Sequence, residues 1–510
     1  MINKKITNNI YILLFLCIFF LHFYQLFFQH WSGVLDQDLI IIYNSILLNS
    51  GMEQEYRDHP AFTTFLINSL IYKFSNFFSD IPSEINSILN SNNIDGIFQF
   101  YFYISRTINF FCNLLLILIF YKILKKLDLR KDLRFILCLI FISSIGYINS
   151  FFFLRSENIS LLFLLFSINV VLSKNRDSVL NFFIAGIFFA ISMLAKIQII
   201  FLALYLIYLI PNINKNHEYK FTNNTYLKNY LLLSFLLGFL SFFIFQIYIQ
   251  EFPRFQNNKY LDLIFFTISF MIFLFYFYLS KNFKKNIYLF SSMLNGFVFF
   301  ILLIFLLDKI NILQINDFIL LRITNPIHYM TEFTVDSVEM ANGIVDIDYI
   351  FRNIKQAFSY YKFNVIELLL LILIILVNLK NKNYFFILFF IFIINTLVMN
   401  FRFNPIYHLF YVFIYLVLFA EMIKKMENRL SNIFSCIALV VFLSNSVNFL
   451  ILKESNFLNE VFNRESGMLK VCKEFKFNTT PNSYETVEYV KYWHNKINDK
   501  KIKKICDEII

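Results

Sequence analysis

The sequence predicts an all-α polytopic membrane protein of about 13 transmembrane helices, with a helical first outer loop and a small C-terminal extracytoplasmic tail. Of its 510 residues, 58% are hydrophobic and only 15% are charged, whereas soluble domains are about 45–50% apolar and about 25% charged. Aromatic residues make up 20% of the chain and include 71 Phe, more than a water-soluble protein of this length can bury. Gly and Pro number only 9 and 7, which excludes a fibrous or linker-rich chain.

The individual spans follow from the apolar runs, because a helix needs about 20 apolar residues to cross a bilayer. The first run lacks a small-residue cleavage site after it, so we expect an uncleaved helix rather than a signal peptide. The run at 61–78 is interrupted by Asn68, Lys73 and Asn76, which indicates an interfacial or re-entrant helix instead of a span. The predicted spans lie at 9–29, 100–121, 134–153, 158–172, 179–195, 197–211, 229–250, 261–279, 287–307, 365–379, 384–400, 405–423 and 432–451.

The basic residues predict an N-terminus in the cytoplasm, since cytoplasmic loops carry an excess of Lys and Arg. This excess accounts for the net charge of +11 without a nucleic-acid partner. Four parts are then predicted to face outward: a first outer loop at 30–99, a short turn at 155–157 and a late outer loop at 308–363, all within a transmembrane domain at 1–452, and a tail at 453–510. The basic groups after even-numbered spans are Lys122, Lys125, Lys126, Arg130, Lys131 and Arg134; Lys174 and Arg176; Lys215, Lys220 and Lys228; Lys281, Lys284 and Lys285; Lys380 and Lys382; and Lys424, Lys425 and Arg429.

The cysteines and the loop lengths exclude several kinds of site. None of the six Cys has a spacing typical of a metal site. Cys17, Cys112, Cys138 and Cys436 lie in apolar runs, where we expect buried thiols. Cytoplasmic loops are short and no Gly-rich phosphate loop occurs, so we expect no nucleotide-driven domain. Energy would therefore come from an activated substrate in the membrane or from an ion gradient, unless the function needs no energy source.

The first outer loop begins with a dense group of polar residues. Asp36 and Asp38 open an amphipathic stretch, Gly51 follows it, and the run at 56–60 reads Tyr-Arg-Asp-His-Pro. Carboxylates beside a bilayer are costly unless they are solvated or used. Asp36 and Asp38 are therefore candidates for catalysis, and the alternative is that they cap a helix N-terminus and interact with its dipole.

This order of an acidic pair, a helix, a glycine and Tyr-Arg-Asp-His-Pro resembles the first loop of the GT-C glycosyltransferases. These membrane enzymes take a sugar from a polyprenyl-phosphate carrier, and their relatives include protein O-mannosyltransferases and the aminoarabinose transferases that modify lipid A. Three later segments resemble the family in the same order. They are Phe-Leu-Arg-Ser-Glu at 153–157, similar to the second acidic turn, Leu-Ala-Lys-Ile-Gln at 194–198, similar to a Lys-containing outer turn, and Arg-Phe-Asn-Pro at 402–405 with His408, similar to a late Arg/Pro segment.

The resemblance implies transfer of a sugar from a polyprenyl-phosphate donor lipid to an extracytoplasmic glycan, glycolipid, lipopolysaccharide or protein, in the inner (plasma) membrane of a bacterium. It implies catalytic roles for Asp36, Asp38 and Asp58, with Asp36 as the expected base. Many family members carry adjacent Asp-Glu, whereas Gln37 separates the acids here. The Pro-Pro that often follows the second acidic site is replaced by His-Pro-Ala at 59–61. The choice between Asp36 and Asp38 therefore stays open.

The chemistry of such a transfer requires these residue types. Inverting transfer from a sugar phosphate needs a base for the acceptor hydroxyl and cations for the departing phosphate. Asp36 and Asp38 would also suit Mg²⁺ or Mn²⁺, which is the one cofactor expected. Each basic residue alone could instead be snorkelling from a helix end. The expected substrate-binding residues at the outer membrane edge are Arg57, His59, Arg155, Glu157, Lys196, Arg402 and His408.

Two other functions share the expected substrate. A transporter or flippase of lipid-linked saccharides would carry ionisable residues deep within several spans, whereas the acids here cluster at outer ends. An O-antigen polymerase or ligase would rely on a large late outer loop, which residues 308–363 supply. In a glycosyltransferase we expect that same loop to act as a lid over the acceptor.

Overall fold

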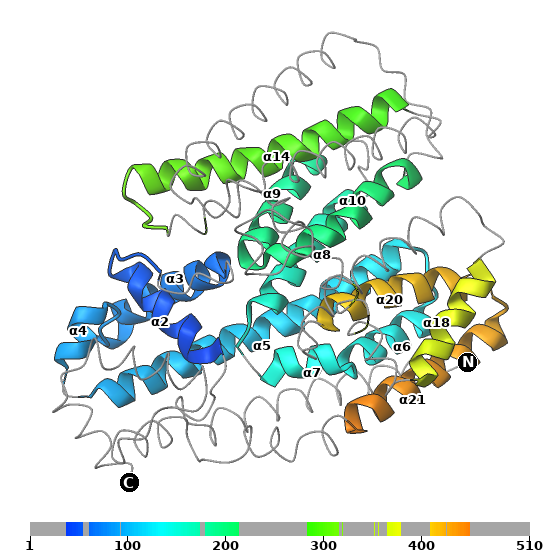
Figure 1. Ribbon diagram of the computed structural model, residues 1–510, viewed down its shortest axis with the longest axis horizontal. Coiled ribbons are helices and arrows are strands. Elements are labelled where there is room, and N and C mark those ends of the chain that lie inside the picture. The colour runs from blue at the N-terminus through cyan, green and yellow to red at the C-terminus, as the bar shows by residue number, and fades with distance from the viewer. Residues whose placement is uncertain are drawn as a thin grey trace.

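The chain is all-helical over the residues that the computed structural model describes, and it contains no β-strand there (Figure 1). These residues are 37–54, 61–91, 93–152, 154–173, 179–213, 283–315, 365–378, 408–424 and 426–448, with single residues at 319, 351 and 355. The elements are α2 (Gln37–Asn49), α3 (Phe62–Ser79), α4 (Ile85–Asn90), α5 (Ile94–Lys126), α6 (Lys131–Ile142), α7 (Ile145–Phe152), α8 (Ser156–Val171), α9 (Val179–Ala195), the 3₁₀ turn η2 (Ile197–Ile199), α10 (Ile200–Ile213), α14 (Phe283–Lys309), α18 (Val365–Asn378), α20 (His408–Ile423) and α21 (Asn428–Asn448).

Three of the described helices are long and apolar enough to cross a membrane. They are the segments Gly96–Lys126 in α5, Lys285–Lys309 in α14 and Asn428–Val447 in α21. This supports the predicted class, an α-helical membrane protein. The predicted spans at 9–29, 229–250, 261–279 and 384–400 lie outside the described residues.

The apolar core surrounds α20. Every residue from Leu409 to Ala420 is buried, and so are Met422 and Ile423. A helix that is apolar on all sides belongs in the interior, because each of its faces needs an apolar neighbour. Helices α6, α7, α18 and α21 pack around it, and Figure 1 shows them together at the side of the bundle away from α2–α4.

Two sequence expectations about these helices are wrong. The run at 134–153 is not one helix but two, α6 and α7, because Ser143 Oγ donates to Leu139 O at 2.7 Å and Ser144 Oγ donates to Phe141 O at 2.6 Å. Such back-bonding competes with helix continuation. Cys112 and Cys138 are buried as expected, but Cys436 is exposed on α21. An apolar run in a membrane helix does not require burial in protein, since lipid can cover it; Cys17 lies outside the described residues.

The basic loops gather at one end of the bundle. Lys126 Nζ donates to Asn169 O at 2.5 Å, and Lys424 Nζ donates to Leu127 O at 2.9 Å. Arg130 Nη2 donates to Asn432 Oδ1 at 2.6 Å. The ends of α5, α8, α20 and α21 that were predicted to be cytoplasmic therefore lie together.

The expected outer segments gather at the opposite end. Helices α2, α3 and α4 lie near the start of α5 in Figure 1, far from its basic end. Gln54 Nε2 of the first outer loop donates to Gln314 O of the late outer loop at 2.8 Å. Along α5, Arg106 and Lys126 are separated by about 30 Å at the ordinary helical rise. The two ends of the bundle thus differ in chemistry.

Candidate functional site

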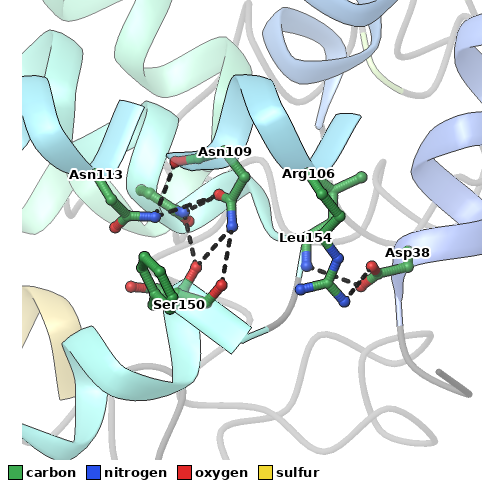
Figure 2. Close-up of polar contacts among 8 residues, drawn as sticks. Asp38, Arg106, Asn109, Asn113, Ser150 and Leu154 are labelled. Carbon is green, nitrogen blue, oxygen red and sulfur yellow. Dashed lines mark hydrogen bonds and ion pairs between the residues drawn. The ribbon is translucent and has the colours of Figure 1, made fainter. Parts of the chain in front are cut away.

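Asp38 joins three segments of the chain at the outer end. It lies in the first turn of α2 and is fully buried. Its Oδ2 pairs with Arg106 Nη2 of α5 at 2.5 Å, and its Oδ1 accepts a hydrogen bond from the backbone N–H of Leu154 at 2.7 Å (Figure 2). Leu154 lies two residues before Ser156, the first residue of α8. Asp38 therefore fixes α2 against both α5 and the start of α8.

The surroundings of Asp38 act on its charge in opposite directions. Burial raises the pKa of Asp38 above its usual value, while the positive charge of Arg106 and the hydrogen bond from Leu154 oppose that rise. Arg106 is thus the group that most favours the ionised carboxylate. Both oxygens of Asp38 are already bonded, so the geometry favours a positioning role for Asp38 over proton abstraction.

A second buried ion pair lies beside the first. Lys196 Nζ pairs with Glu157 Oε1 at 2.9 Å, and both side chains are shielded from solvent. Glu157 is in the first turn of α8, where a carboxylate interacts well with the helix dipole. Lys196 follows α9, and its backbone N–H donates to Ser192 O at 3.1 Å. Arg155, also buried, sits at the N-cap position of α8.

These contacts bring three sequence-distant segments into one cluster. Leu154, which bonds Asp38, is three residues before Glu157, which bonds Lys196. The cluster therefore joins the first outer loop, the acidic turn at 153–157 and the Lys-containing turn at 194–198. We call Asp38, Arg106, Arg155, Glu157 and Lys196 the outer charge cluster.

Neighbouring polar contacts hold the turn before α8 in place. Asn109 Nδ2 of α5 donates to Ser150 O at 3.1 Å and to Phe151 O at 3.3 Å, which satisfies carbonyls at the end of α7. Asn158 Nδ2 of α8 donates to Ser150 O at 2.9 Å and also bonds Asn109 Oδ1 (Figure 2). The end of α7 is thus hydrogen-bonded to both α5 and α8.

Hydrogen bonds join helices α8 and α9 to each other close to Lys196. Ser160 Oγ donates to Ser192 O at 2.9 Å, and Ser192 Oγ donates to Ser160 O at 2.6 Å. Thr63 Oγ1 of α3 donates to Ile191 O at 2.8 Å. These hydroxyls pair with backbone carbonyls that have a second lone pair available, so the helices approach closely without leaving polar groups unbonded.

Helices α2 and α3 are held on α5 by a second set of polar contacts. Ser69 Oγ donates to Asn49 Oδ1 at 2.5 Å, which links α3 to α2. The hydroxyls of Tyr72 and Ser105 are hydrogen-bonded, which links α3 to α5 one residue before Arg106. Helices α2 and α3 are therefore docked on α5 next to Arg106.

Of the predicted site residues, the structure brings together Asp38, Arg155, Glu157 and Lys196. The prediction that the stretch after Asp36 is helical is confirmed by α2. The remaining predicted residues, Asp36, Arg57, Asp58, His59 and Arg402, lie outside the described residues, and so does the side chain of His408.

The expected divalent cation finds no support at Asp38. Its two oxygens bond a guanidinium and a peptide N–H, so a cation there would have to displace Arg106. The described part of the chain has no group of three or more His, Cys, Asp or Glu side chains that could hold a metal. A metal ligand role for Asp36 stays a prediction.

Arg106 is the member of the cluster that sequence reasoning missed. It is the single charged residue within the predicted span at 100–121, and intramembrane charges usually have a specific partner. That signal was available, but its partner in α2 is 68 positions away in the sequence. Only the packing of α2 on α5 reveals the pair.

Comparison of the chain with known protein families, curated proteins and solved structures finds no match. A function is therefore inferred from the pattern of the sequence and the geometry of the outer charge cluster.

Proposed function

We propose that the protein is a membrane glycosyltransferase of the bacterial inner (plasma) membrane. It moves a sugar from a polyprenyl-phosphate donor lipid to an extracytoplasmic glycan, glycolipid, lipopolysaccharide or protein. Asp36 is the base that takes the proton of the acceptor hydroxyl, and Asp58 is a second essential acid. A well-placed base of this kind contributes about 10²–10⁴-fold to a rate.

The outer charge cluster is the observation that carries the proposal. Three of the segments that resemble the GT-C glycosyltransferases are far apart in the sequence, and their charged residues meet at one end of the bundle. That end lies opposite the basic loops, on the side where the donor sugar would be presented. A chance resemblance would not require these residues to converge.

Within this proposal the cations of the cluster serve the donor phosphate. Arg155 and Lys196 supply positive charge for the phosphate that departs, and Glu157 orients Lys196. Asp38 and Arg106 hold α2, and with it the start of the first outer loop, in a fixed position. Further contacts to donor or acceptor come from Arg57, His59, Arg402 and His408.

One observation favours a transporter of lipid-linked saccharides as the second candidate. Glu367 is a fully buried carboxylate in the apolar helix α18, and its Oε2 accepts a hydrogen bond from Asn445 Nδ2 of α21 at 3.1 Å. Transporters place such groups along their substrate path. Glu367 is in the first turn of α18, near a helix end, so this observation weighs less than the outer charge cluster.

A complementation experiment tests the proposal. Mass spectrometry of cell-envelope glycolipids and glycoproteins from a deletion strain should show one sugar missing, and the wild-type gene should restore it. Asp36→Asn should fail to restore the sugar although the protein is inserted in the membrane at normal level. Asp80→Asn is the matched control, because Asp80 is exposed, lies in the same loop and has a φ of 54° that Asn tolerates.

Each contrary outcome has a distinct meaning. Restoration of the sugar by Asp36→Asn and also by Asp38→Asn would exclude the proposed base. An unchanged set of envelope sugars, with lipid-linked saccharides accumulating on the cytoplasmic side, would favour the transporter.

A further inference from the structure

The polarity of α3 is inverted relative to a helix that faces water. Its buried face carries the polar side chains Thr64, Asn68, Ser69 and Tyr72 after the apolar Phe62 and Phe65 of its first turn. Its exposed face is apolar over the second half of the helix, where Leu70, Phe74, Phe77 and Phe78 are 59%, 66%, 83% and 70% exposed. A surface helix in water shows the reverse arrangement.

The exposed rings form a continuous apolar ridge. The ring centroids of Phe74 and Phe78 are 4.8 Å apart, and those of Phe77 and Phe78 are 5.3 Å apart. An exposed apolar patch of this kind marks a surface that binds protein or membrane. Lys73 is exposed on the same side, where its aliphatic stem can lie along apolar surface while its amine reaches a polar layer.

The helix that carries the ridge is fastened to α5. The rings of Tyr72 and Tyr101 are in tilted contact with centroids 4.2 Å apart, and the hydroxyl of Tyr72 bonds Ser105. Helix α5 is long and apolar enough to span a membrane, and its residues Phe111 and Leu118 are 56% and 57% exposed. Tyr101 and Ser105 lie within this candidate span, so α3 is fastened to α5 at the level where a bilayer would surround the helix.

We propose that the second half of α3, residues 70–78, is embedded in the bilayer, with phospholipid acyl chains covering Leu70, Phe74, Phe77 and Phe78. These nine residues extend over about 14 Å, which is less than the roughly 30 Å of hydrocarbon, so α3 enters one leaflet and does not span. Its polar face, which includes Asn68 and Tyr72, points toward the protein. Helix α3 thus contacts lipid with one face and polar protein groups with the other. This placement does not depend on the reaction that the protein performs.

Fluorescence quenching of single-tryptophan proteins in phosphatidylcholine nanodiscs tests this. The chain has only two Trp, so Trp31→Phe with Trp493→Phe provides a background for Phe77→Trp. Leu118→Trp, on the outward face of α5, is the lipid-facing control. Ser87→Trp, at an exposed position of α4, is the water-facing control. Each protein is measured with bromine on the acyl chains and, separately, with iodide in the buffer, which reaches both faces of a nanodisc.

Brominated acyl chains should cause a loss of fluorescence in Phe77→Trp comparable to that in Leu118→Trp, while iodide should act on Ser87→Trp alone. Phe78→Trp should behave as Phe77→Trp does and guards against a local disturbance at one position. Quenching of both α3 variants by iodide, at the level of Ser87→Trp, would place the ridge in water. Protection of both from either quencher would mean that protein covers the ridge. Either result overturns the proposal.

Discussion

At Asp38 a carboxylate without access to solvent is balanced by one guanidinium and one peptide N–H. Removing a charge from water is costly, and the pair regains that cost only while both partners are present. Replacing one partner by an apolar side chain leaves the other charge buried alone. Replacing both by apolar side chains of similar size leaves an apolar contact of similar volume. The pair therefore contributes more to fixing α2 on α5 than to net stability.

The Asp38–Arg106 pair gives a double-mutant prediction. Arg106→Met should lower the free energy of unfolding by about 3–5 kcal/mol, because Asp38 is left buried and unpaired. The combination of Arg106→Met with Asp38→Leu should lose clearly less than Arg106→Met alone. Thermal unfolding in detergent measures both, with Lys73→Met at an exposed site as the control. Equal losses for the single and double variants would contradict a buried, coupled pair.

At the scale of elements, α9 and α14 cross at unusually short range. A Cβ atom at Gly186 of α9 would overlap the carbonyl oxygen of Met293, and one at Gly296 of α14 would overlap the carbonyl oxygen of Phe183. The two glycines thus face the opposing backbone reciprocally. Small residues permit such close approach, and van der Waals contact then stabilises helices in a membrane. This crossing fixes α9, the helix that ends just before Lys196, against α14.

The crossing predicts strong effects from very small substitutions. Gly186→Ala or Gly296→Ala should each lower the free energy of unfolding by about 1–3 kcal/mol, because one methyl group forces the helices apart. Leu294→Ala, on the outward side of α14, is the control. It should have a smaller effect, although it removes three carbon atoms whereas each glycine substitution adds only one. Thermal unfolding in detergent again provides the measurement. If neither alanine variant lowered the free energy of unfolding, α9 and α14 would not approach each other as closely as described.

At the scale of the whole molecule, the two ends of the bundle are chemically distinct. Lysine and arginine side chains bond backbone carbonyls near helix ends at one end, and paired acids and bases are buried at the other. Such an arrangement orients the protein in a membrane, because basic loops are retained in the cytoplasm. The contact of Gln54 with Gln314 agrees with an outward position for both the first and the late outer loop.

Reporter fusions check this orientation. A fusion at Lys126 should report the cytoplasm, because Lys126 belongs to the basic end. Fusions at Ser87 in the first outer loop and at Lys470 in the tail should both report the outside. Agreement between Lys126 and Ser87 would overturn the orientation, since α5 would then not cross the membrane. A cytoplasmic signal from Lys470 alone would instead correct the number of spans after Lys126.

The sequence by itself determined the class of the protein, the place of most helices and the two ends of the bundle. These properties depend on local composition: apolar runs predicted α8, α9 and α20, and clustered Lys and Arg predicted the end at which α5 stops. The run at 61–78 is helical, as α3, but its polar interruptions do not share one environment, since Asn68 is buried and Lys73 is exposed.

The tertiary structure alone decided which polar residues are partners. Whether Asp38 caps a helix, takes a proton or pairs with a base depends on what α5 and the start of α8 place beside it, and no local pattern contains that information. The same holds for the break between α6 and α7, where serine hydroxyls compete with the helix, and for Cys436, which lies in an apolar run but is exposed on α21. Long-range pairing in a bundle is fixed by helix packing, whereas sequence periodicity reports only on each helix separately.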